Sequence, residues 1–406
     1  MSTTLVVTND FPPRQGGIET FVHAMATRFP GGDVVVHTSS EPGASAFDAT
    51  LPFPVIRDPA RTLLPTPRAT ARTLDLVREY GCDRVWFGAA APLGAMAPAL
   101  RRAGVRRIVA TTHGHEIWWA RVPGARGLLR RIGSGVDVVT YLGDHTRNRI
   151  APALDPDVRM SRLVPGVDPP AFRGDAVAEQ GRALRARHGL EGRKVVLSLA
   201  RLVPRKGQDM LIRALPIIRR TVPEAVLLVV GDGPDARRLR RLADAQPPGS
   251  VVFAGGVRHA ETPGYYAAAD VFAMPCRTRR GGLEAEGLGI VYLEAAAGGL
   301  PVVVGDSGGA PDAVLDGRTG TVVDGRDVRA VADAVGRLLC TPEGAAMGAA
   351  GRRWVERMWT WDASAAHLTR LLTPRPEPGD SSPRRPELPY VRRDFPYVRR
   401  NFPYGR

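Results

Sequence analysis

The chain has 406 residues, more than the ~250 to 300 at which a single hydrophobic core stops growing, so we expect two domains. Its formal net charge of +15 attracts phosphate groups, which makes nucleic acid and anionic lipid the first candidate partners. The odd cysteine count, with neither disulfide nor zinc spacing, excludes a disulfide framework and favours a reducing cytoplasm. No apolar run approaches the ~20 residues that span a bilayer, and the strand-like start at Leu5 leaves no room for a signal peptide. We therefore expect a soluble or peripheral protein.

Short β-branched runs alternate with helical patterns through the first part of the chain. The expected strands are Leu5 to Thr8, Val34 to Thr38, Arg84 to Phe87, Arg107 to Thr111, Val136 to Tyr141 and Arg162 to Val164. The expected helices between them are Ile18 to Phe29, Thr66 to Tyr80, Pro92 to Ala103 and Asp144 to Ala153. Such alternation predicts a parallel sheet with helices on both faces.

A Pro/Gly-rich break at residues 164–170 ends this pattern, which then restarts. The second set of expected strands is Lys194 to Leu199, Ala225 to Val230, Val251 to Ala254, Val271 to Met274, Pro301 to Val304 and Thr321 to Val323. The sequence therefore predicts an α/β fold with two Rossmann-like, doubly wound domains that face a cleft. In such sheets ligands bind beyond the carboxyl ends of the strands.

The domain boundaries follow from this pattern. Residues 1–168 form the first domain and residues 169–355 the second, and residues 356–373 contain a helix, Trp361 to Leu372, that packs back on the first domain. Residues 374–406 carry a seven-residue repeat with eight arginines and four acids. No core can be built from that composition, so we expect a disordered basic tail.

Two carboxylates, Glu286 and Glu294, flank a glycine turn and the start of a helix. One acid can face a sugar hydroxyl and the other a ribose, while the amides of Leu288, Gly289 and Ile290 point to where a diphosphate would lie. The spacing indicates the sugar-nucleotide end of an active site. A capped helix with two solvated acids is the alternative.

Arg201 and Lys206 follow a strand and precede a helix, so both cations can reach one anion. A departing diphosphate needs positive charge, and two fixed cations supply it without a metal. Lys206 is one of only two lysines among 56 basic residues, which favours a role for a compact point charge. A solvated basic loop is the alternative.

The loop after the first strand begins with Asn9 and Asp10 and ends with Gly16 and Gly17 just before a helix. Glycines at a helix start allow the backbone to approach a phosphate or a sugar closely, although a plain tight turn has the same composition. His113 follows another strand, and the histidine spacing around it does not suit a metal. We interpret His113 as a hydrogen-bonding residue over the sugar, with a structural histidine as the alternative.

An arginine-rich stretch, Arg121 to Arg131, follows Trp118 and Trp119, within a region of 50 residues that holds ten arginines and three acids. Its apolar residues alternate with arginines in a way that suits a helix lying on an anionic bilayer. A core-packed helix with a solvated arginine face is the alternative.

These motifs together resemble the family 4 retaining glycosyltransferases of GT-B fold over roughly residues 3 to 372. Within that family, the segments Asn9 to Glu19, Thr112 to Glu116 and Gly281 to Ala295 look like the actinobacterial mannosyltransferases that add the second mannose to phosphatidylinositol mannoside. The Arg/Pro-rich tail has no counterpart that we recognise in the family.

The resemblance implies a role for each candidate residue. His113, Arg201, Lys206 and Glu286 would be catalytic, and Asn9 and Asp10 would contact the acceptor. The donor would be bound by Gly16, Gly17, Arg201, Lys206, Val257, Glu286, Leu288, Gly289, Ile290 and Glu294. In this scheme Val257 meets the base, Glu294 the ribose, and Arg201 and Lys206 the diphosphate.

The implied reaction is mannose transfer from GDP-mannose to a phosphatidylinositol mannoside, with an α-1,6 linkage and retention of configuration. No metal or other cofactor is expected, nor a nucleic-acid partner. The enzyme would lie in the cytoplasm, peripherally associated with the inner face of the plasma membrane where an anionic phospholipid acceptor is presented. Other α-glycosyltransferases, a nucleotide-sugar epimerase or phosphorylase, and a basic adaptor protein remain alternatives, and the oligomeric state is open.

Overall fold

The computed structural model describes residues 3–374 and contains two parallel sheets. The first has seven strands in the order β3-β2-β1-β4-β5-β6-β7 and the second has six in the order β10-β9-β8-β11-β12-β13. The first sheet is built from β1 (Thr3–Val7), β2 (Val34–Ser39), β3 (Val55–Asp58), β4 (Cys82–Phe87), β5 (Arg107–Thr111), β6 (Val138–Tyr141) and β7 (Met160–Arg162). The second comprises β8 (Lys194–Leu199), β9 (Ala225–Val230), β10 (Val251–Gly255), β11 (Val271–Met274), β12 (Val302–Gly305) and β13 (Thr321–Val323). The predicted pair of doubly wound parallel sheets is confirmed.

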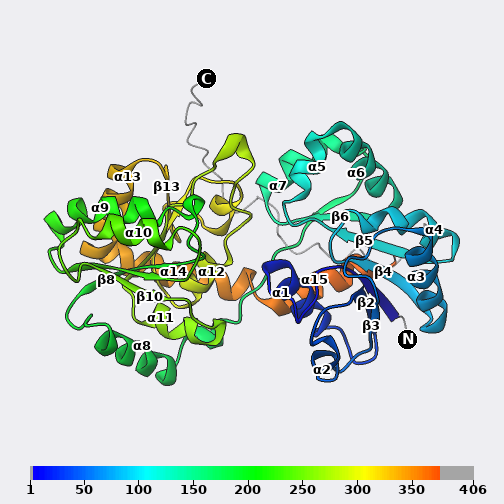
Figure 1. The fold of residues 1–406 in the computed structure, drawn as a ribbon, viewed down its shortest axis with the longest axis horizontal. Helices are drawn as coiled ribbons and strands as arrows, with labels where there is room; N and C mark the ends of the chain where they lie inside the picture. Colours follow the sequence, from blue (N-terminus) through cyan, green and yellow to red (C-terminus); the bar gives the residue numbers. More distant parts are fainter. Residues whose placement is uncertain (1–2, 375–406) are drawn as a thin grey trace, which may run out of the picture. The chain divides into compact units, whose positions relative to one another are not determined.

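Helices follow most strands (Figure 1). Those around the first sheet are α1 (Gly17–Ala26), α2 (Ala44–Asp48), α3 (Pro67–Glu79), α4 (Ala97–Arg102), α5 (Glu116–Arg121), α6 (Pro123–Gly135) and α7 (Asp144–Ile150). Those of the second part are α8 (Asp175–Arg187), α9 (Gln208–Thr221), α10 (Ala236–Ala243), α11 (Thr262–Ala267), α12 (Ile290–Ala297), α13 (Val328–Cys340), α14 (Pro342–Met358) and α15 (Trp361–Leu372). Short 3-10 turns occur at residues 93–96, 151–153, 169–172, 204–206, 259–261, 280–282 and 310–313.

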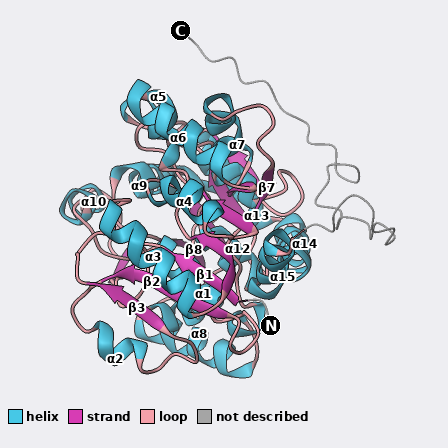
Figure 2. Cartoon of the chain, turned by 90° about the vertical axis from the view of Figure 1, so that its right-hand side faces the viewer, coloured by secondary structure: helices cyan, strands magenta, loops and turns pink. Residues whose placement is uncertain are grey.

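Helices lie on both sides of the strands (Figure 2), and the side chains on both faces of each sheet are apolar. Along β1, Leu5 and Val7 pack in one buried cluster and Val6 in another, because alternate side chains of a strand point to opposite faces. Along β8, Val195 and Val196 divide in the same way. This two-sided burial explains why the strands read as continuous apolar runs in the sequence.

Several elements differ from the predicted ones. Strand β7, expected at Arg162 to Val164, lies at Met160–Arg162, and the helix expected from Asp144 to Ala153 ends at Ile150 before a 3-10 turn. Strand β3 and helix α2 were not predicted, because both are short and β3 is only partly buried, so neither carries a clear apolar pattern. The helix expected from Pro92 to Ala103 is a 3-10 turn followed by α4, since Pro98 lies in the first turn of α4 and has no N–H with which to continue an earlier helix.

Helix α15 returns from the second part of the chain to the first sheet, where it lies beside α1 (Figure 1). Leu368 and Leu371 join the cluster that covers this face of the sheet, and Arg107 Nε donates to the Leu371 carbonyl oxygen at 2.8 Å. The connection between the sheets is packed as well, since Val164 and Val167 belong to the core of the second sheet. The predicted basic tail lies outside the described residues, apart from Pro374.

Candidate active site

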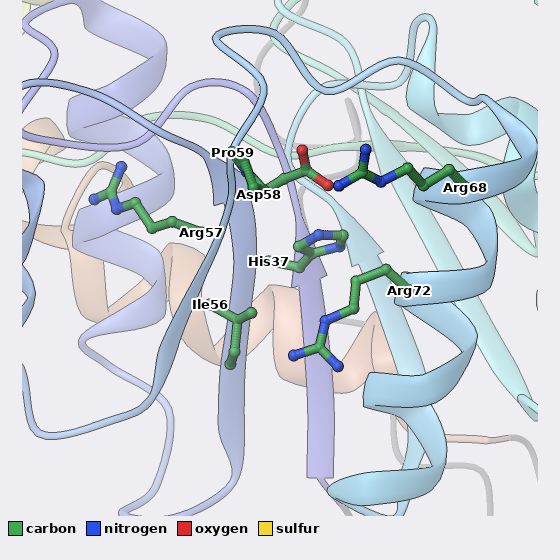
Figure 3. A pocket seen from close by; sticks show the side chains of 7 residues that line it. All are labelled: His37, Ile56, Arg57, Asp58, Pro59, Arg68 and Arg72. Carbon is green, nitrogen blue, oxygen red and sulfur yellow. The ribbon is translucent and has the colours of Figure 1, made fainter.

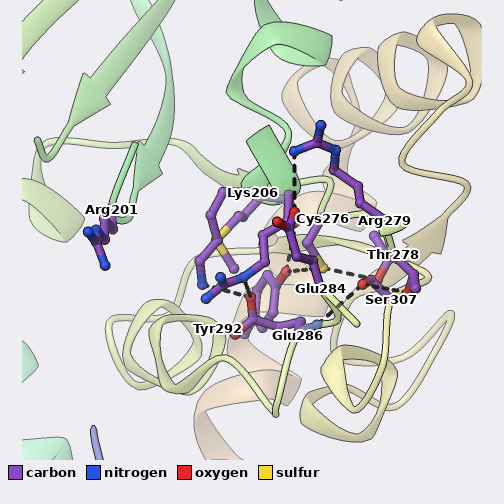
Figure 4. Close-up of polar contacts among 12 residues, drawn as sticks. Arg201, Lys206, Cys276, Thr278, Arg279, Glu284, Glu286, Tyr292 and Ser307 are labelled. Carbon is purple, nitrogen blue, oxygen red and sulfur yellow. Dashed lines mark hydrogen bonds and ion pairs between the residues drawn. The ribbon is translucent and has the colours of Figure 1, made fainter. Parts of the chain in front are cut away.

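Glu286 and Lys206 form an ion pair at the carboxyl end of the second sheet (Figure 4). Lys206 Nζ donates to Glu286 Oε2 at 2.7 Å, and the two side chains are only 12% and 9% exposed. A second cation, Arg205, places its Nε 4.0 Å from the same oxygen. The carboxylate therefore has two positive side chains within 4.0 Å, and it belongs to the loop that precedes α12.

The backbone of Glu286 is fixed by the segment that follows β12. Its N–H donates to Ser307 Oγ at 3.3 Å, and Gly309 N–H donates to the Glu286 carbonyl oxygen at 2.8 Å. Gly308 has φ +59°, and a Cβ there would lie 2.1 Å from that carbonyl oxygen. Only glycine fits this close approach, so the glycine pair at 308–309 positions the carboxylate.

Lys206 is positioned by a turn between β8 and α9. Gly207 ends the turn with φ +80°, and a Cβ there would lie 2.1 Å from the Pro275 carbonyl oxygen, so this turn lies against the chain that leaves β11. Arg201 begins the same connection but is exposed. In Figure 4 its guanidinium lies apart from the Lys206–Glu286 pair, so the predicted convergence of Arg201 and Lys206 on one anion stays a prediction.

Glu294 lies on the second turn of α12 and is buried. The Tyr266 hydroxyl donates to Glu294 Oε2 at 2.7 Å, and His259 Nδ1 lies 4.0 Å from Oε1. Burial raises the pKa of the Glu294 carboxyl, while the bond from Tyr266 opposes that rise. The bond from Tyr266 to Oε2 thus orients the carboxylate, and the other oxygen, Oε1, faces the exposed His259.

The first turn of α12 supplies backbone donors beside these acids. Gly289 precedes the helix with φ +81°, Ile290 is its first residue, and Leu288 is buried beneath them. The leading N–H groups of a helix have no intrahelical acceptor and carry its positive dipole end, which suits an anion. Val257 follows β10 and packs against the core of the second sheet.

In the first sheet, His113 follows β5 and is held in one tautomer. Its Nε2 lies 2.7 Å from the Gly88 carbonyl oxygen, which can only accept, so Nε2 carries the proton. Burial lowers the pKa of His113 to about 4, which leaves the ring neutral at pH 7 and Nδ1 as an acceptor. Its backbone N–H donates to the buried Glu116 at 3.0 Å, and its ring meets Phe21 edge-on.

The loop after β1 contains the other candidate residues of the first sheet. Gly16 and Gly17 are exposed at the start of α1, and a Cβ at Gly17 would meet nothing within 4 Å. Asn9 uses its amide on the backbone of Leu63, donating from Nδ2 at 2.9 Å and accepting at Oδ1 at 2.6 Å. This pairing gives Asn9 a structural role in addition to the predicted contact with the acceptor. The pKa of Asp10 is raised, first by burial and then by Glu19.

The candidate residues of the first sheet and those of the second lie close to one another at two places. A Cβ at Gly287 would lie 3.9 Å from the His113 carbonyl oxygen, and one at Gly282 would lie 3.4 Å from the Arg121 guanidinium. The loop that carries Glu286 is therefore adjacent to the segment that carries His113.

Sequence reasoning did not single out Arg205 or Ser307 for this site. Arg205 stands beside Lys206 in the chain, but the motif gives no reason to assign it a role of its own. Ser307 fixes the Glu286 backbone from 21 positions away, a distance at which spacing carries no signal.

No helix within residues 3–374 is long and apolar enough to cross a bilayer.

Comparison with known families defines the class. Residues 15–170 match the family "Glycosyltransferase Family 4" and residues 181–354 match "Glycosyl transferases group 1". HepE from Anabaena, solved in complex with UDP, has a similar fold, with a TM-score of 0.74 and 19% identity over 92% of this chain and 99% of its own. The class is that of the GT-B glycosyltransferases.

Closer relatives narrow the family. The chain is 51% identical, over 92% of its length and 99% of the relative, to the GDP-mannose-dependent alpha-(1-6)-phosphatidylinositol monomannoside mannosyltransferase of Mycolicibacterium smegmatis. It is 45% identical, over 92% and 98%, to the GDP-mannose-dependent monoacylated alpha-(1-6)-phosphatidylinositol monomannoside mannosyltransferase of Corynebacterium glutamicum. The chain therefore belongs to the family 4 glycosyltransferases, in the group that contains these mannosyltransferases.

Proposed function

We propose that this enzyme transfers mannose from GDP-mannose to a phosphatidylinositol monomannoside, forming an α-1,6 linkage with retention of configuration. The relatives that carry this activity in their names align with nearly the whole chain. The main structural support for the proposal is the Lys206–Glu286 ion pair. Gly287, the residue after Glu286, lies next to the backbone of His113.

The proposed chemistry breaks the bond between the anomeric carbon of mannose and the β-phosphate oxygen, and forms a bond from that carbon to the acceptor oxygen. The acceptor proton passes to the departing phosphate. Lys206, Arg205 and Arg201 stabilise the negative charge that develops on the diphosphate, together with the first N–H groups of α12. The reaction balances without any further reactant.

Three side chains orient the donor in this proposal. Nδ1 of the neutral His113 ring accepts a hydrogen bond from a mannose hydroxyl, because Nε2 donates its proton to the Gly88 carbonyl oxygen. Glu286 accepts a hydrogen bond from another hydroxyl of the sugar. Glu294 accepts hydrogen bonds from the ribose hydroxyls at Oε1, while its Oε2 accepts from the Tyr266 hydroxyl. We also propose that transfer needs no metal, so activity should persist in excess EDTA after the protein has been dialysed against chelator.

We further propose that the enzyme works at the surface of an anionic membrane. Trp118, Val122 and Leu283 are 50%, 36% and 66% exposed, and the contact of Gly282 with Arg121 brings the segment of Leu283 to α5. Exposed apolar side chains beside arginines suit the boundary between headgroups and acyl chains. Co-sedimentation should show binding to vesicles that contain phosphatidylinositol and weak binding to neutral ones, and Trp118→Ser should reduce the former.

The direct test of the proposed function is product analysis. Incubation of the enzyme with GDP-mannose and a phosphatidylinositol monomannoside should give GDP and a lipid one hexose heavier. Thermal shift should show stabilisation by GDP at concentrations where UDP has little effect. A new nucleotide sugar formed from GDP-mannose without any acceptor would instead identify an epimerase and overturn the proposal.

A further inference from the structure

A separate pocket of about 220 Å³ lies on the first sheet, among β2, β3 and α3 (Figure 3). Its polar lining consists of His37, Arg57, Asp58, Arg68 and Arg72. The volume is below the ~300 to 1,000 Å³ of pockets that hold drug-sized ligands, so it suits a small polar molecule. None of these residues belongs to the candidate donor site.

His37 presents an unpaired acceptor to this pocket. Thr73 Oγ1 lies 2.8 Å from the Ala69 carbonyl oxygen and donates its single proton there, so it accepts from His37 Nδ1 at 3.2 Å. Burial lowers the pKa of His37 to about 4, so the ring is neutral and Nε2 bears a lone pair. That Nε2 is buried and has no partner among the described residues. A buried polar atom without a partner calls for an explanation, and a ligand hydroxyl would satisfy it.

The three arginines of the pocket are not equivalent. The Arg57 guanidinium already has partners within the protein. It donates to both oxygens of Asp48 at 2.8 and 2.9 Å and to two carbonyl oxygens. Arg68 is exposed and has no ion-pair partner among residues 3–374. Among the described residues, Arg72 pairs only with Glu79, at a loose 3.7 Å and with both side chains about half exposed. Arg68 and Arg72 are therefore the cations that remain for an anionic ligand.

Asp58 makes a bare anion an unsuitable occupant. Its Oδ1 accepts from the Ala60 N–H at 2.9 Å, and Oδ2 accepts nothing from the described residues. Asp58 lines the pocket together with His37 and Arg68, as labelled in Figure 3. The pocket thus combines two guanidinium donors with two acceptors, Asp58 Oδ2 and His37 Nε2.

We propose that this pocket binds a phosphorylated polyol, with the phosphate on Arg68 and Arg72 and hydroxyls on His37 Nε2 and Asp58. Guanidinium groups match phosphate oxygens in geometry and charge, and the two acceptors require hydroxyl donors. The ligand is a cyclitol phosphate or sugar phosphate, either free or as the headgroup of a phospholipid. This site lies beyond the proposed donor chemistry and does not depend on it.

The backbone beside the pocket is tied to the loop after β1. Arg57 donates to the Pro12 carbonyl oxygen at 2.5 Å, and Asn9 holds the Leu63 backbone at both its N–H and its carbonyl oxygen. Two fixed links therefore connect the pocket wall with the loop that contains Gly16 and Gly17. A bound phosphorylated polyol is positioned to stabilise that loop.

Calorimetry on the full chain tests the proposal. The probes are myo-inositol 1-phosphate, inorganic phosphate and myo-inositol, and we expect measurable binding for the first and at least about tenfold weaker binding for the other two. The double variant R68Q/R72Q should lose ~10-fold or more in affinity for myo-inositol 1-phosphate. Arg78→Gln is the matched control, because Arg78 is an exposed arginine of the same helix outside the pocket.

A second variant tests the acceptor. His37→Phe should bring the affinity for myo-inositol 1-phosphate down toward that for inorganic phosphate, provided that circular dichroism shows an intact fold. Unchanged binding in R68Q/R72Q, or equal binding of inorganic phosphate and myo-inositol 1-phosphate by the parent chain, would overturn the proposal. So would the absence of binding both to free myo-inositol 1-phosphate and to vesicles that contain phosphatidylinositol.

Vesicles distinguish the two sources of the ligand. Binding of the free probe identifies a soluble phosphorylated polyol, whereas binding only to vesicles with phosphatidylinositol, lost in R68Q/R72Q but not in Arg78→Gln, identifies the headgroup. GDP affinity is measured on every variant in parallel. Failure of GDP to bind the parent chain would count against the proposed donor chemistry and would leave this site to be judged on its own probes.

Discussion

Lys206 Nζ and Glu286 Oε2 are 2.7 Å apart, although 80 positions separate these residues in the chain. Both side chains are almost buried, so each charge depends on the other for compensation. The pair joins the turn before α9 to the loop before α12, and both segments are held by glycines that tolerate no side chain. Its two members have different proposed tasks, charge stabilisation for Lys206 and sugar binding for Glu286.

Removal of one partner and of both partners should have different effects on stability. Lys206→Met leaves a nearly buried carboxylate with only Arg205 at 4.0 Å, so we expect a lower melting temperature and a loss of ~100-fold or more in kcat. The double variant K206M/E286Q removes both charges and should recover most of the stability while it stays inactive. Thermal denaturation and turnover with saturating GDP-mannose measure the two effects. A double variant that regained activity would contradict the assignment of Lys206 to the diphosphate.

Glycine substitutions separate ligand contact from fold. Gly17→Ala adds a methyl group where nothing lies within 4 Å, so we expect an unchanged melting temperature. Its activity should nevertheless fall at least tenfold if the donor approaches this backbone closely. Gly308→Ala is the contrast, because its Cβ would lie 2.1 Å from the Glu286 carbonyl oxygen at a residue with φ +59°. That variant should lose stability as well as activity. Normal turnover in Gly17→Ala would remove the glycine pair from the donor site.

Regular alternation allowed the two sheets to be predicted, and strands such as Lys194–Leu199 and Val271–Met274 have the predicted bounds. Strand Val55–Asp58 was missed because it has four residues, is partly buried throughout and lies at the sheet edge. The pocket at His37 depends on that strand, whose register places Ile56 opposite His37. No local pattern could therefore indicate the pocket.

Motifs located residues of the donor site but not their partners. Glu294 was predicted from its place in a helix after a glycine turn, while Tyr266, which donates to it, lies 28 positions earlier in an ordinary apolar helix. Such partners are set by tertiary packing of α11 against α12, and a single sequence contains no spacing rule for them.

Glu294 and Tyr266 provide a graded test of ribose binding. Glu294→Gln should weaken GDP binding by ~10- to 100-fold, because hydrogen bonds to a charged group contribute about 1.5 to 3 kcal/mol. Tyr266→Phe keeps the carboxylate but removes the bond at 2.7 Å that orients it, so a smaller loss is expected. Titration calorimetry with GDP and with guanine base separates ribose contacts from base contacts. Equal losses for GDP and guanine in Glu294→Gln would argue against a ribose contact.

His113 should make stability depend on pH in a defined window. Its pKa is about 4 in the folded chain and 6.5 as the ordinary value, so between these pH values the unfolded chain binds more protons. The stabilisation from neutral His113 is complete above pH 6.5 and is lost as the pH falls toward 4. The upper limit is about 3 kcal/mol, at 1.36 kcal/mol for each pKa unit. The buried carboxyl of Glu116, whose pKa is raised by burial, acts in the opposite direction.

A matched variant isolates the contribution of His113 from that of Glu116 and of His37. His113→Gln keeps a donor for the Gly88 carbonyl oxygen and does not titrate. Urea unfolding of both proteins at pH 7.5, 6, 5 and 4.5 gives the difference in unfolding free energy at each pH. We expect the advantage of the parent chain to shrink steadily toward low pH. A difference that is independent of pH would mean that His113 titrates alike in the folded and unfolded chains, and the neutral acceptor proposed at Nδ1 would lose its basis.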